Sequence, residues 1–156
     1  MPELRAKVLT VSDGVIAGTR EDKSGDALVA TLTEAGYAIA DRQVVGDGVE
    51  SVGLALTELC EDFAGLVVTT GGTGFGPRDL TPEGTLAVID REAPGLAEAM
   101  RLVSPLGRLS RAAAGTRDQA LIVNTPGSSA GAVETLTAIL DVVPHALDLL
   151  AGGRPH

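Results

Sequence analysis

The sequence predicts an α/β fold in which a mainly parallel sheet is covered by helices on both faces. Short apolar runs typical of strands alternate with segments whose apolar residues recur at helical spacing. Such alternation requires right-handed crossover connections, which make neighbouring strands parallel and place helices on both faces. Four of the expected strands end in polar or glycine-rich corners, and ligands bind at the carboxyl ends of parallel strands. One crevice at that edge is therefore the expected site.

The elements of the first half follow from this pattern. We expect strands over 5–12, 37–45 and 66–70, and helices over 24–35 and 49–63. Ser24 is the expected N-cap of the first helix, and Gly36 is expected to follow its last turn. These segments form a β-α-β-α-β unit that ends at a glycine-rich loop.

The second half is expected to close the fold. Helices are predicted over about 82–91 and 95–102, strands over 108–112 and 119–123, and closing helices over 130–140 and 144–150. Pro144 suits a first helical turn, where its missing N–H costs no hydrogen bond.

Composition limits what kind of protein this is. The 156 residues suit one domain over 1–156, and with 2% aromatic residues and no Trp its core must be aliphatic. A single cysteine, Cys60, excludes an intramolecular disulfide and fits a reducing compartment. No apolar run approaches the roughly 20 residues of a membrane span. We therefore expect a cytoplasmic protein without a membrane partner, and a net charge of −9 argues against a nucleic-acid partner.

The most informative segment is the glycine loop, residues 71–79, which follows a predicted strand and leads into a helix. Glycines allow tight turns and close backbone approach, and free N–H groups at such a corner form an anion cradle. The alternative is a turn-rich linker, but the hydroxyl, guanidinium and carboxylate groups beside the glycines favour a phosphate site. The contributing residues are Thr70, Gly71, Gly72, Thr73, Gly74, Gly76, Arg78 and Asp79.

Two common phosphate loops are excluded. The only lysines are Lys7 and Lys23, so the loop lacks the lysine of a Walker A motif. Its glycines also do not fit the G-x-G-x-x-G spacing, and the loop does not follow the first strand as the dinucleotide fingerprint requires.

Two carboxylates lie on strand-end loops, Asp47 and Asp79. Paired carboxylates at a phosphate site are typical ligands of Mg²⁺, which prefers oxygen ligands and is often shared with substrate phosphates. A solvated surface charge is the alternative for any one acidic residue, and it applies with most force to Asp13.

Two further motifs carry polar groups. The segment after the 119–123 strand places Asn124, Pro126, Gly127 and Ser128 before a helix, where amides and hydroxyls are available to an anion, although helix capping alone also explains Ser128. Ser110 and Arg111 offer a hydroxyl and a guanidinium to a phosphate or an oxygen-rich ring.

These motifs together resemble the molybdenum cofactor biosynthesis family, and within it the molybdopterin adenylyltransferases. The resemblance runs from about residue 7 to residue 150. It rests on Thr70-Gly-Gly-Thr-Gly, Arg78-Asp-Leu-Thr-Pro-Glu, Ala93-Pro-Gly-Leu, Leu109-Ser-Arg and Asn124-Thr-Pro-Gly. It implies a three-layer α/β/α domain, usually a homotrimer, that transfers AMP from Mg-ATP to the terminal phosphate of molybdopterin and releases pyrophosphate.

The resemblance also implies residue roles. Asp47 and Asp79 match the catalytic, metal-binding aspartates of the family, and Ser110 matches a pterin-binding serine. The glycine loop is expected to contact a phosphate of the nucleotide or the pterin. The full set of expected substrate-binding residues is Ser12, Asp13, Thr70, Gly71, Gly72, Thr73, Gly74, Arg78, Ser110, Arg111, Asn124, Pro126, Gly127 and Ser128.

A second interpretation belongs to another functional class. A non-catalytic molybdopterin-binding or scaffolding protein of the same fold would contact other molybdenum cofactor biosynthesis proteins instead of transferring AMP. Such a protein has no need of paired acidic groups, and this chain carries both Asp47 and Asp79. The acidic pair therefore favours the enzyme.

Overall fold

The computed structural model describes residues 3–154, which form an α/β fold around a six-stranded sheet of order β2-β1-β3-β6-β5-β4. The strands are β1 (Arg5–Val11), β2 (Ala38–Val45), β3 (Gly65–Thr70), β4 (Arg91–Glu92), β5 (Ala114–Arg117) and β6 (Ala120–Thr125). The first four strands across the sheet are parallel, whereas β5 pairs antiparallel with both β6 and β4. The prediction of a mostly parallel sheet is confirmed.

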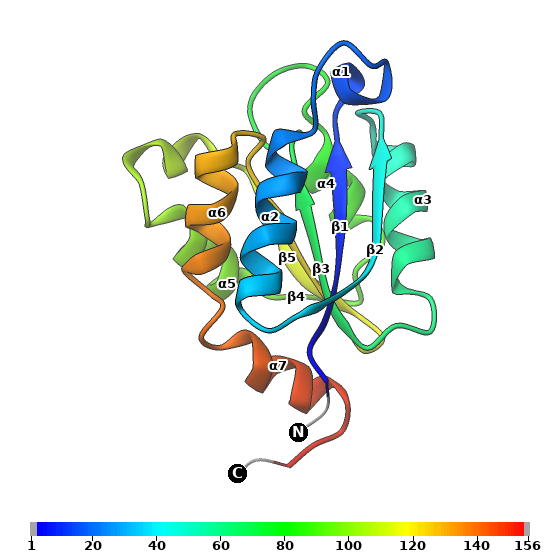
Figure 1. The fold of residues 1–156 in the computed structure, drawn as a ribbon, viewed down its shortest axis with the longest axis vertical. Helices are drawn as coiled ribbons and strands as arrows, with labels where there is room; N and C mark the ends of the chain where they lie inside the picture. Colours follow the sequence, from blue (N-terminus) through cyan, green and yellow to red (C-terminus); the bar gives the residue numbers. More distant parts are fainter. Residues whose placement is uncertain (1–2, 155–156) are drawn as a thin grey trace.

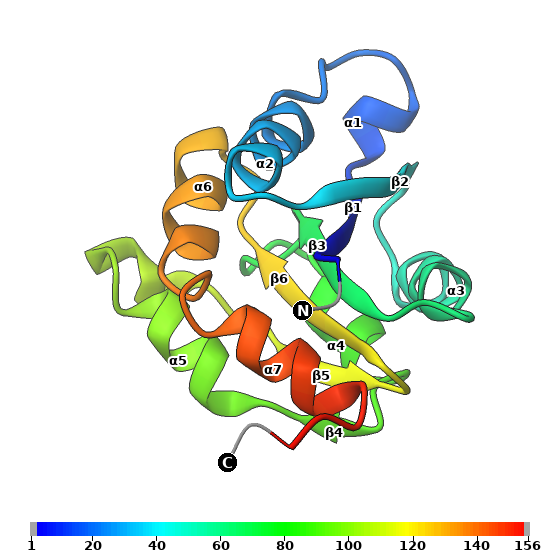
Figure 2. The same cartoon turned by 60° about the horizontal axis from the view of Figure 1, so that its bottom comes forward.

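Helices cover both faces of the sheet (Figures 1 and 2). One face carries α2 (Lys23–Glu34), α5 (Pro94–Arg101), α6 (Ser129–Thr137) and α7 (Val143–Leu150). The other carries α3 (Val49–Cys60) and α4 (Thr81–Leu86). A short helix, α1 (Asp13–Ile16), lies at the carboxyl end of β1, and a 3-10 helix, η1 (Pro105–Leu109), follows α5. The arrangement is the three-layer α/β/α fold that the family resemblance implies.

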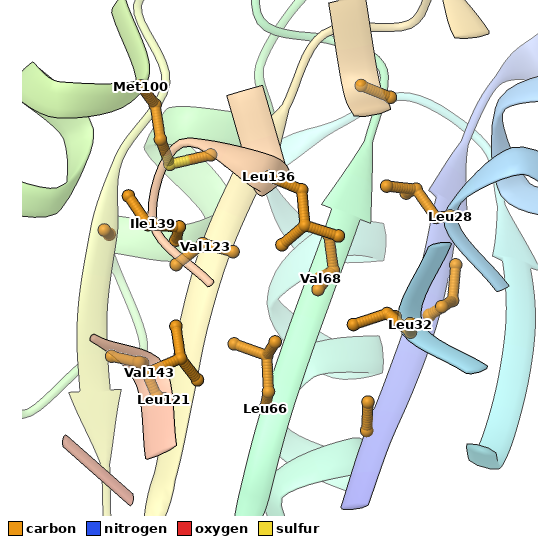
Figure 3. Packing of buried hydrophobic residues seen from close by; sticks show 14 of the residues in the cluster. Leu28, Leu32, Leu66, Val68, Met100, Leu121, Val123, Leu136, Ile139 and Val143 are labelled. Atoms are coloured by element: carbon orange, nitrogen blue, oxygen red, sulfur yellow. The ribbon is translucent and has the colours of Figure 1, made fainter. Parts of the chain in front are cut away.

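The core has two halves because successive residues of a strand face opposite sides of the sheet. In β3, Leu66 and Val68 pack against α2, α6 and their neighbours, whereas Val67 packs against α3. Figure 3 shows the first half, where Leu28 and Leu32 of α2 lie over the same face as the β3 side chains. As expected from the composition, aliphatic side chains dominate, each contributing about 1.5–3 kcal/mol when fully buried.

The predicted N-cap of α2 is wrong. The helix begins at Lys23, and the Asp22 carboxylate caps it by accepting a hydrogen bond from the Gly25 amide at 3.0 Å. The hydroxyl of Thr10 donates to both oxygens of the same carboxylate at 2.9 Å. This contact with β1 fixes the start of the helix. A local sequence pattern does not reveal it, because Thr10 lies 12 residues before Asp22 in the chain.

Several predicted boundaries also differ. The strand expected over 108–112 is absent: this segment holds the end of η1 and extended backbone, and the strand lies at β5 instead. The main-chain amide of Arg111 donates to Thr73 O at 2.9 Å, which ties the segment to the glycine loop rather than to the sheet. The helix expected over 82–91 ends at Leu86, and the helix expected over 49–63 ends at Cys60, shortly before Asp62 adopts a left-handed φ of 49°.

The strand β6 is longer than expected, and it includes Asn124 and Thr125. Both residues are fully buried. Within residues 3–154, no helix combines the length and apolar character that crossing a bilayer requires.

Candidate functional site

A cavity of about 1140 Å³ opens at the carboxyl ends of β1, β2, β3 and β6. The structure brings most of the predicted site residues to its wall: Ser12, Asp47, Thr70, Gly71, Gly72, Thr73, Gly74, Asp79, Ser110, Asn124, Pro126, Gly127 and Ser128. Three of the predicted residues, Asp13, Arg78 and Arg111, do not line it. The residues of the wall come from four separate strand ends, so the parallel sheet assembles this site as expected.

The glycine loop begins with two residues that require glycine. Gly71 and Gly72 have φ values of 99° and 69°, which side chains rarely allow. A Cβ atom on Gly71 would overlap the carbonyl oxygen of Val11, and one on Gly72 would overlap the hydroxyl of Thr81. The backbone therefore passes directly over the end of β1 and the start of α4.

Asp79 folds the far end of the glycine loop. Its carboxylate accepts a hydrogen bond from the Gly76 amide at 2.8 Å, and its own amide donates to Gly76 O at 3.0 Å. A Cβ atom on Gly74 would lie 3.0 Å from the same carboxylate. The loop thus bends back on itself with the Asp79 carboxylate inside the bend and at the cavity wall.

Asp47 and Asp13 are linked directly. The Asp13 amide donates to the Asp47 carboxylate at 3.0 Å, and the Asp47 amide donates to the Asp13 carboxylate at the same distance. Burial raises the pKa of Asp47, and the nearby negative charges of Asp13 and Asp79 add to the rise. The hydrogen bond from Arg78 lowers the pKa of Asp13.

Arg78 is occupied by protein groups. Its Nε lies 2.6 Å from Asp13 Oδ2, and its Nη2 donates to Asp47 O at 3.0 Å. Arg78 and Asp13, which were expected to bind substrate, bond in this structure to each other and to Asp47.

Asn124 is fully buried at the cavity wall, and its side-chain amide bonds to protein groups. Its amide nitrogen donates to the hydroxyls of Thr69 and Thr85 at 3.0 Å each, and its carbonyl oxygen accepts from the Ala113 amide at 3.0 Å. The expected ligand role of Asn124 is therefore replaced by a structural one. The residue ties β3 and α4 to the segment before β5, and it does so beneath the cavity.

The Arg111 side chain also bonds to protein groups. Its guanidinium donates to Gly74 O at 2.8 Å, to Asp79 O, and to the Glu83 carboxylate at 2.6 Å. These bonds occupy the guanidinium that was expected to contact a phosphate. Glu83 was not predicted as a site residue, because at the sequence level it is one of 21 acidic residues.

Three cations at the cavity wall were also missed: Arg20, Lys23 and Arg101. Arg20 lies in the loop between α1 and α2 and Lys23 is the first residue of α2, in a stretch that carried no recognised motif. Arg101 ends α5 and donates to Ala112 O at 2.7 Å. The sequence shows that these three residues are basic, but it does not show that the fold brings them to the cavity wall beside the strand ends.

The residues present fit a divalent metal. Asp47 and Asp79 both line the cavity, and the Asp79 charge acts on the Asp47 carboxyl. No group of three or more His, Cys, Asp or Glu side chains with metal-binding spacing occurs among residues 3–154. Two carboxylates suit Mg²⁺, which commonly takes one or two protein carboxylates and completes its shell with water and substrate phosphates.

Curated relatives share nearly the whole chain. The chain is 37% identical to the molybdopterin adenylyltransferase of Helicobacter pylori (strain J99) over 161 residues, covering 97% of this chain and 90% of the relative. It is likewise 37% identical to the molybdopterin adenylyltransferase of Escherichia coli (strain K12), covering 97% of this chain and 88% of the relative.

Solved structures agree. The molybdopterin biosynthesis enzyme MoaB from Thermus thermophilus superimposes with a TM-score of 0.90 at 43% identity, covering 96% of this chain and 97% of that one. A structure of MogA gives a TM-score of 0.88 at 37% identity, covering 94% of this chain and 99% of that one. The model of the probable molybdopterin binding domain matches residues 7–145. The chain belongs to this molybdopterin-binding domain family of molybdenum cofactor biosynthesis proteins.

Proposed function

We propose that this protein is a molybdopterin adenylyltransferase that transfers AMP from Mg-ATP to the terminal phosphate of molybdopterin. The observation that carries the proposal is the pair of carboxylates, Asp47 and Asp79, at the wall of a cavity that also contains the glycine loop. The names of the relatives in Helicobacter pylori and Escherichia coli support the same activity.

The reaction needs positioning more than covalent chemistry. A phosphate oxygen of molybdopterin attacks the α-phosphorus of ATP, the bond between the α-phosphorus and the bridging oxygen breaks, and pyrophosphate leaves. The attacking phosphate is already anionic, so no general base is required. Catalysis then rests on orientation and on neutralising charge, as in other phosphoryl transfers.

The residues of the cavity have different roles in this reaction. Asp47 and Asp79 hold the metal, and Mg²⁺, when bound, neutralises charge on the phosphates. The Gly71 amide donates to Thr125 O at 3.1 Å, so the anion is met by the amides of Gly72 and Gly74, which approach it closely because no side chain intervenes. Ser110 offers a hydroxyl to the pterin.

The net charge of −9 requires local compensation, because both substrates are anions. The cavity wall itself carries the carboxylates of Glu21, Asp22, Asp47, Asp79 and Glu134. Mg²⁺ and backbone amides would offset part of this negative charge, together with the cations Arg20, Lys23 and Arg101, which also line the cavity. Their positive charge acts over a short range, since exposed charges are screened beyond about 8–10 Å at physiological salt.

The proposal extends to assembly and location. We propose a homotrimer, supported by the family resemblance and by strongly exposed apolar side chains that association would cover, such as Leu102 (84% exposed) and Leu106 (73%). A cytoplasmic location fits the single, buried, unpaired Cys60. Contacts with other molybdenum cofactor biosynthesis proteins would supply and remove the pterin. Light scattering at micromolar concentration tests the trimer, and a monomer would count against it.

The activity is tested by measuring pyrophosphate release from Mg-ATP in the presence of molybdopterin. We expect release that depends on both substrates and on Mg²⁺. The alternative, a non-catalytic molybdopterin-binding or scaffolding protein, predicts pterin binding by equilibrium methods without release of pyrophosphate. That result would reject the adenylyltransferase while keeping the binding site.

A further inference from the structure

We propose that Arg111 is a positioning residue whose guanidinium bonds to both ends of the loop segment 74–79 and thereby fixes the position of Asp79. Glu83 orients this guanidinium. The proposal rests on the proposed function and deepens it. Arg111 is the residue after Ser110, so it connects the segment that carries the proposed pterin contact to the segment that carries a proposed metal ligand.

The contacts of Arg111 span the two ends of this segment. Nε donates to Gly74 O at 2.8 Å, and Nη2 donates to Asp79 O. The main-chain amide of Arg111 also donates to Thr73 O at 2.9 Å, one residue before the segment begins. One side chain therefore bridges the residues between which the loop bends.

Glu83 completes the arrangement from α4. Its two carboxylate oxygens accept from Nη1 at 2.6 Å and from Nη2 at 3.2 Å. Both side chains are partly exposed, at 35% for Arg111 and 41% for Glu83, so the ion pair itself adds little to stability. The ion pair instead orients Arg111, because a two-point contact fixes the plane of the guanidinium.

The chemistry of arginine suits this role and that of lysine does not. The guanidinium presents five donors in a rigid fork, and here Nε and the two Nη atoms reach three different acceptors. A lysine ammonium at the same position is a single point at the end of a flexible chain and cannot hold Gly74 O and Asp79 O in a fixed relation. With these bonds lost, only the bonds between Asp79 and Gly76 would hold the Asp79 carboxylate.

The first arm of the test needs no substrate. In Arg111→Lys we expect hydrogen–deuterium exchange to accelerate in the peptide that contains Gly76 and Asp79, relative to wild type. Arg108→Lys is the matched control, because Arg108 lies three residues before Arg111, in η1, and donates to Pro105 O at 3.2 Å instead of to the segment 74–79. Unchanged exchange in a folded Arg111→Lys would overturn the proposal. If that variant does not fold, Glu83→Gln should show a smaller acceleration, and an unchanged rate there would overturn it.

The second arm measures pyrophosphate release. Arg111→Lys should lower kcat by about 10²-fold, the cost of a misplacement of about 1 Å, and raise the Mg²⁺ concentration for half-maximal rate, with little change in the KM of ATP. In an Asp79→Asn background, adding Arg111→Lys should cost little more, because both changes act on one group. A full further loss there, with a raised KM for ATP, would show that Arg111 binds the phosphate directly and would overturn the proposal. Accelerated exchange together with an inactive wild type would support the role in loop order and reject the proposed function instead.

Discussion

The main-chain amides of Asp13 and Asp47 each donate to the other residue's carboxylate, at 3.0 Å in both directions. Asp13 follows β1 and Asp47 follows β2, and these strands are neighbours in the parallel sheet. The reciprocal pair therefore locks two strand-end corners together. Arg78, from the glycine loop after β3, joins a third strand end to this pair, because its guanidinium bonds both to the Asp13 carboxylate and to Asp47 O.

This relationship predicts that Asp13 and Arg78 act on the reaction through Asp47. Asp13→Ala and Arg78→Ala should each lower the rate of pyrophosphate release several-fold, because each removes a bond that positions the metal-binding residue Asp47. The double variant should be little worse than either single variant. Asp26→Ala, which removes another exposed arginine partner at 2.6 Å, is the control and should keep the rate. Independent, multiplying effects of the two substitutions would contradict the coupling.

Asp79→Asn should leave the fold intact and lower adenylyl transfer by about 10²–10³-fold. The carboxamide oxygen can still accept the bond from the Gly76 amide, now 2.8 Å from the carboxylate, but the charge that holds the metal is gone. Metal stabilisation of the transition state is worth several kcal/mol, and each ~1.4 kcal/mol changes the rate tenfold.

Asp47→Asn should show a similar loss, and the double variant should add little, because both residues act as one site. Asp141→Asn is the control: it lies between α6 and α7, away from the cavity wall. Molybdopterin binding, measured by equilibrium fluorescence, should persist in all of these variants. Turnover of Asp79→Asn near the wild-type rate would rule out the metal-carboxylate mechanism.

The pKa of Asp47 predicts an acid limit for activity. Burial raises this pKa above the ordinary value of 3.8, so the carboxyl takes up a proton at a higher pH than a free aspartate does. Metal binding requires the ionised form, and the rate should fall on the acid side with a midpoint above 3.8. The Mg²⁺ requirement should rise over the same range. A midpoint at or below the ordinary aspartate value, in a profile of kcat/KM, which reports the free enzyme, would exclude Asp47 as the titrating group.

The same shift affects stability with a definite sign. A raised pKa means that the folded state binds the proton more tightly, so the charge on Asp47 destabilises the metal-free fold above its folded pKa. Asp47→Asn should therefore gain stability near neutral pH, and this gain should vanish as the pH falls below the ordinary value. Asp13 behaves oppositely: its lowered pKa gives a contribution that is present at neutral pH and lost on acidification. Denaturant unfolding at several pH values measures both.

Gly72→Ala should destabilise the protein by about 2 kcal/mol or more. A left-handed backbone costs a residue with a side chain roughly 1–2 kcal/mol, and overpacking costs about 1–3 kcal/mol. Here φ is 69°, and the new methyl group would overlap the buried Thr81 hydroxyl. Gly95→Ala in α5 is the matched control, since a Cβ there meets nothing within 4 Å, and it should stay within about 0.5 kcal/mol of wild type. Equal unfolding midpoints for the two variants would contradict this account.

Much of the fold is determined by the sequence alone. The period-2 and period-3.6 apolar patterns are local, and they predicted the parallel strands β1, β2, β3 and β6 and the longer helices. Because parallel strands end at one edge, the same pattern predicted that Asp47 and Asp79 would share a cavity. The motifs also predicted the family, since the glycine loop and the Arg78-Asp79 pair are contiguous in the chain.

Only the tertiary structure decided what several polar side chains do. Arg78, Arg111 and Asn124 carry groups that suit a phosphate, yet their partners are protein atoms 11–65 residues away in the chain. A sequence shows which donors exist, but it does not show which acceptors the fold brings near them, and buried polar groups are hydrogen-bonded to protein partners. The same reason explains the cap of α2, because the contact between Thr10 and Asp22 exists only after β1 and the helix have packed together.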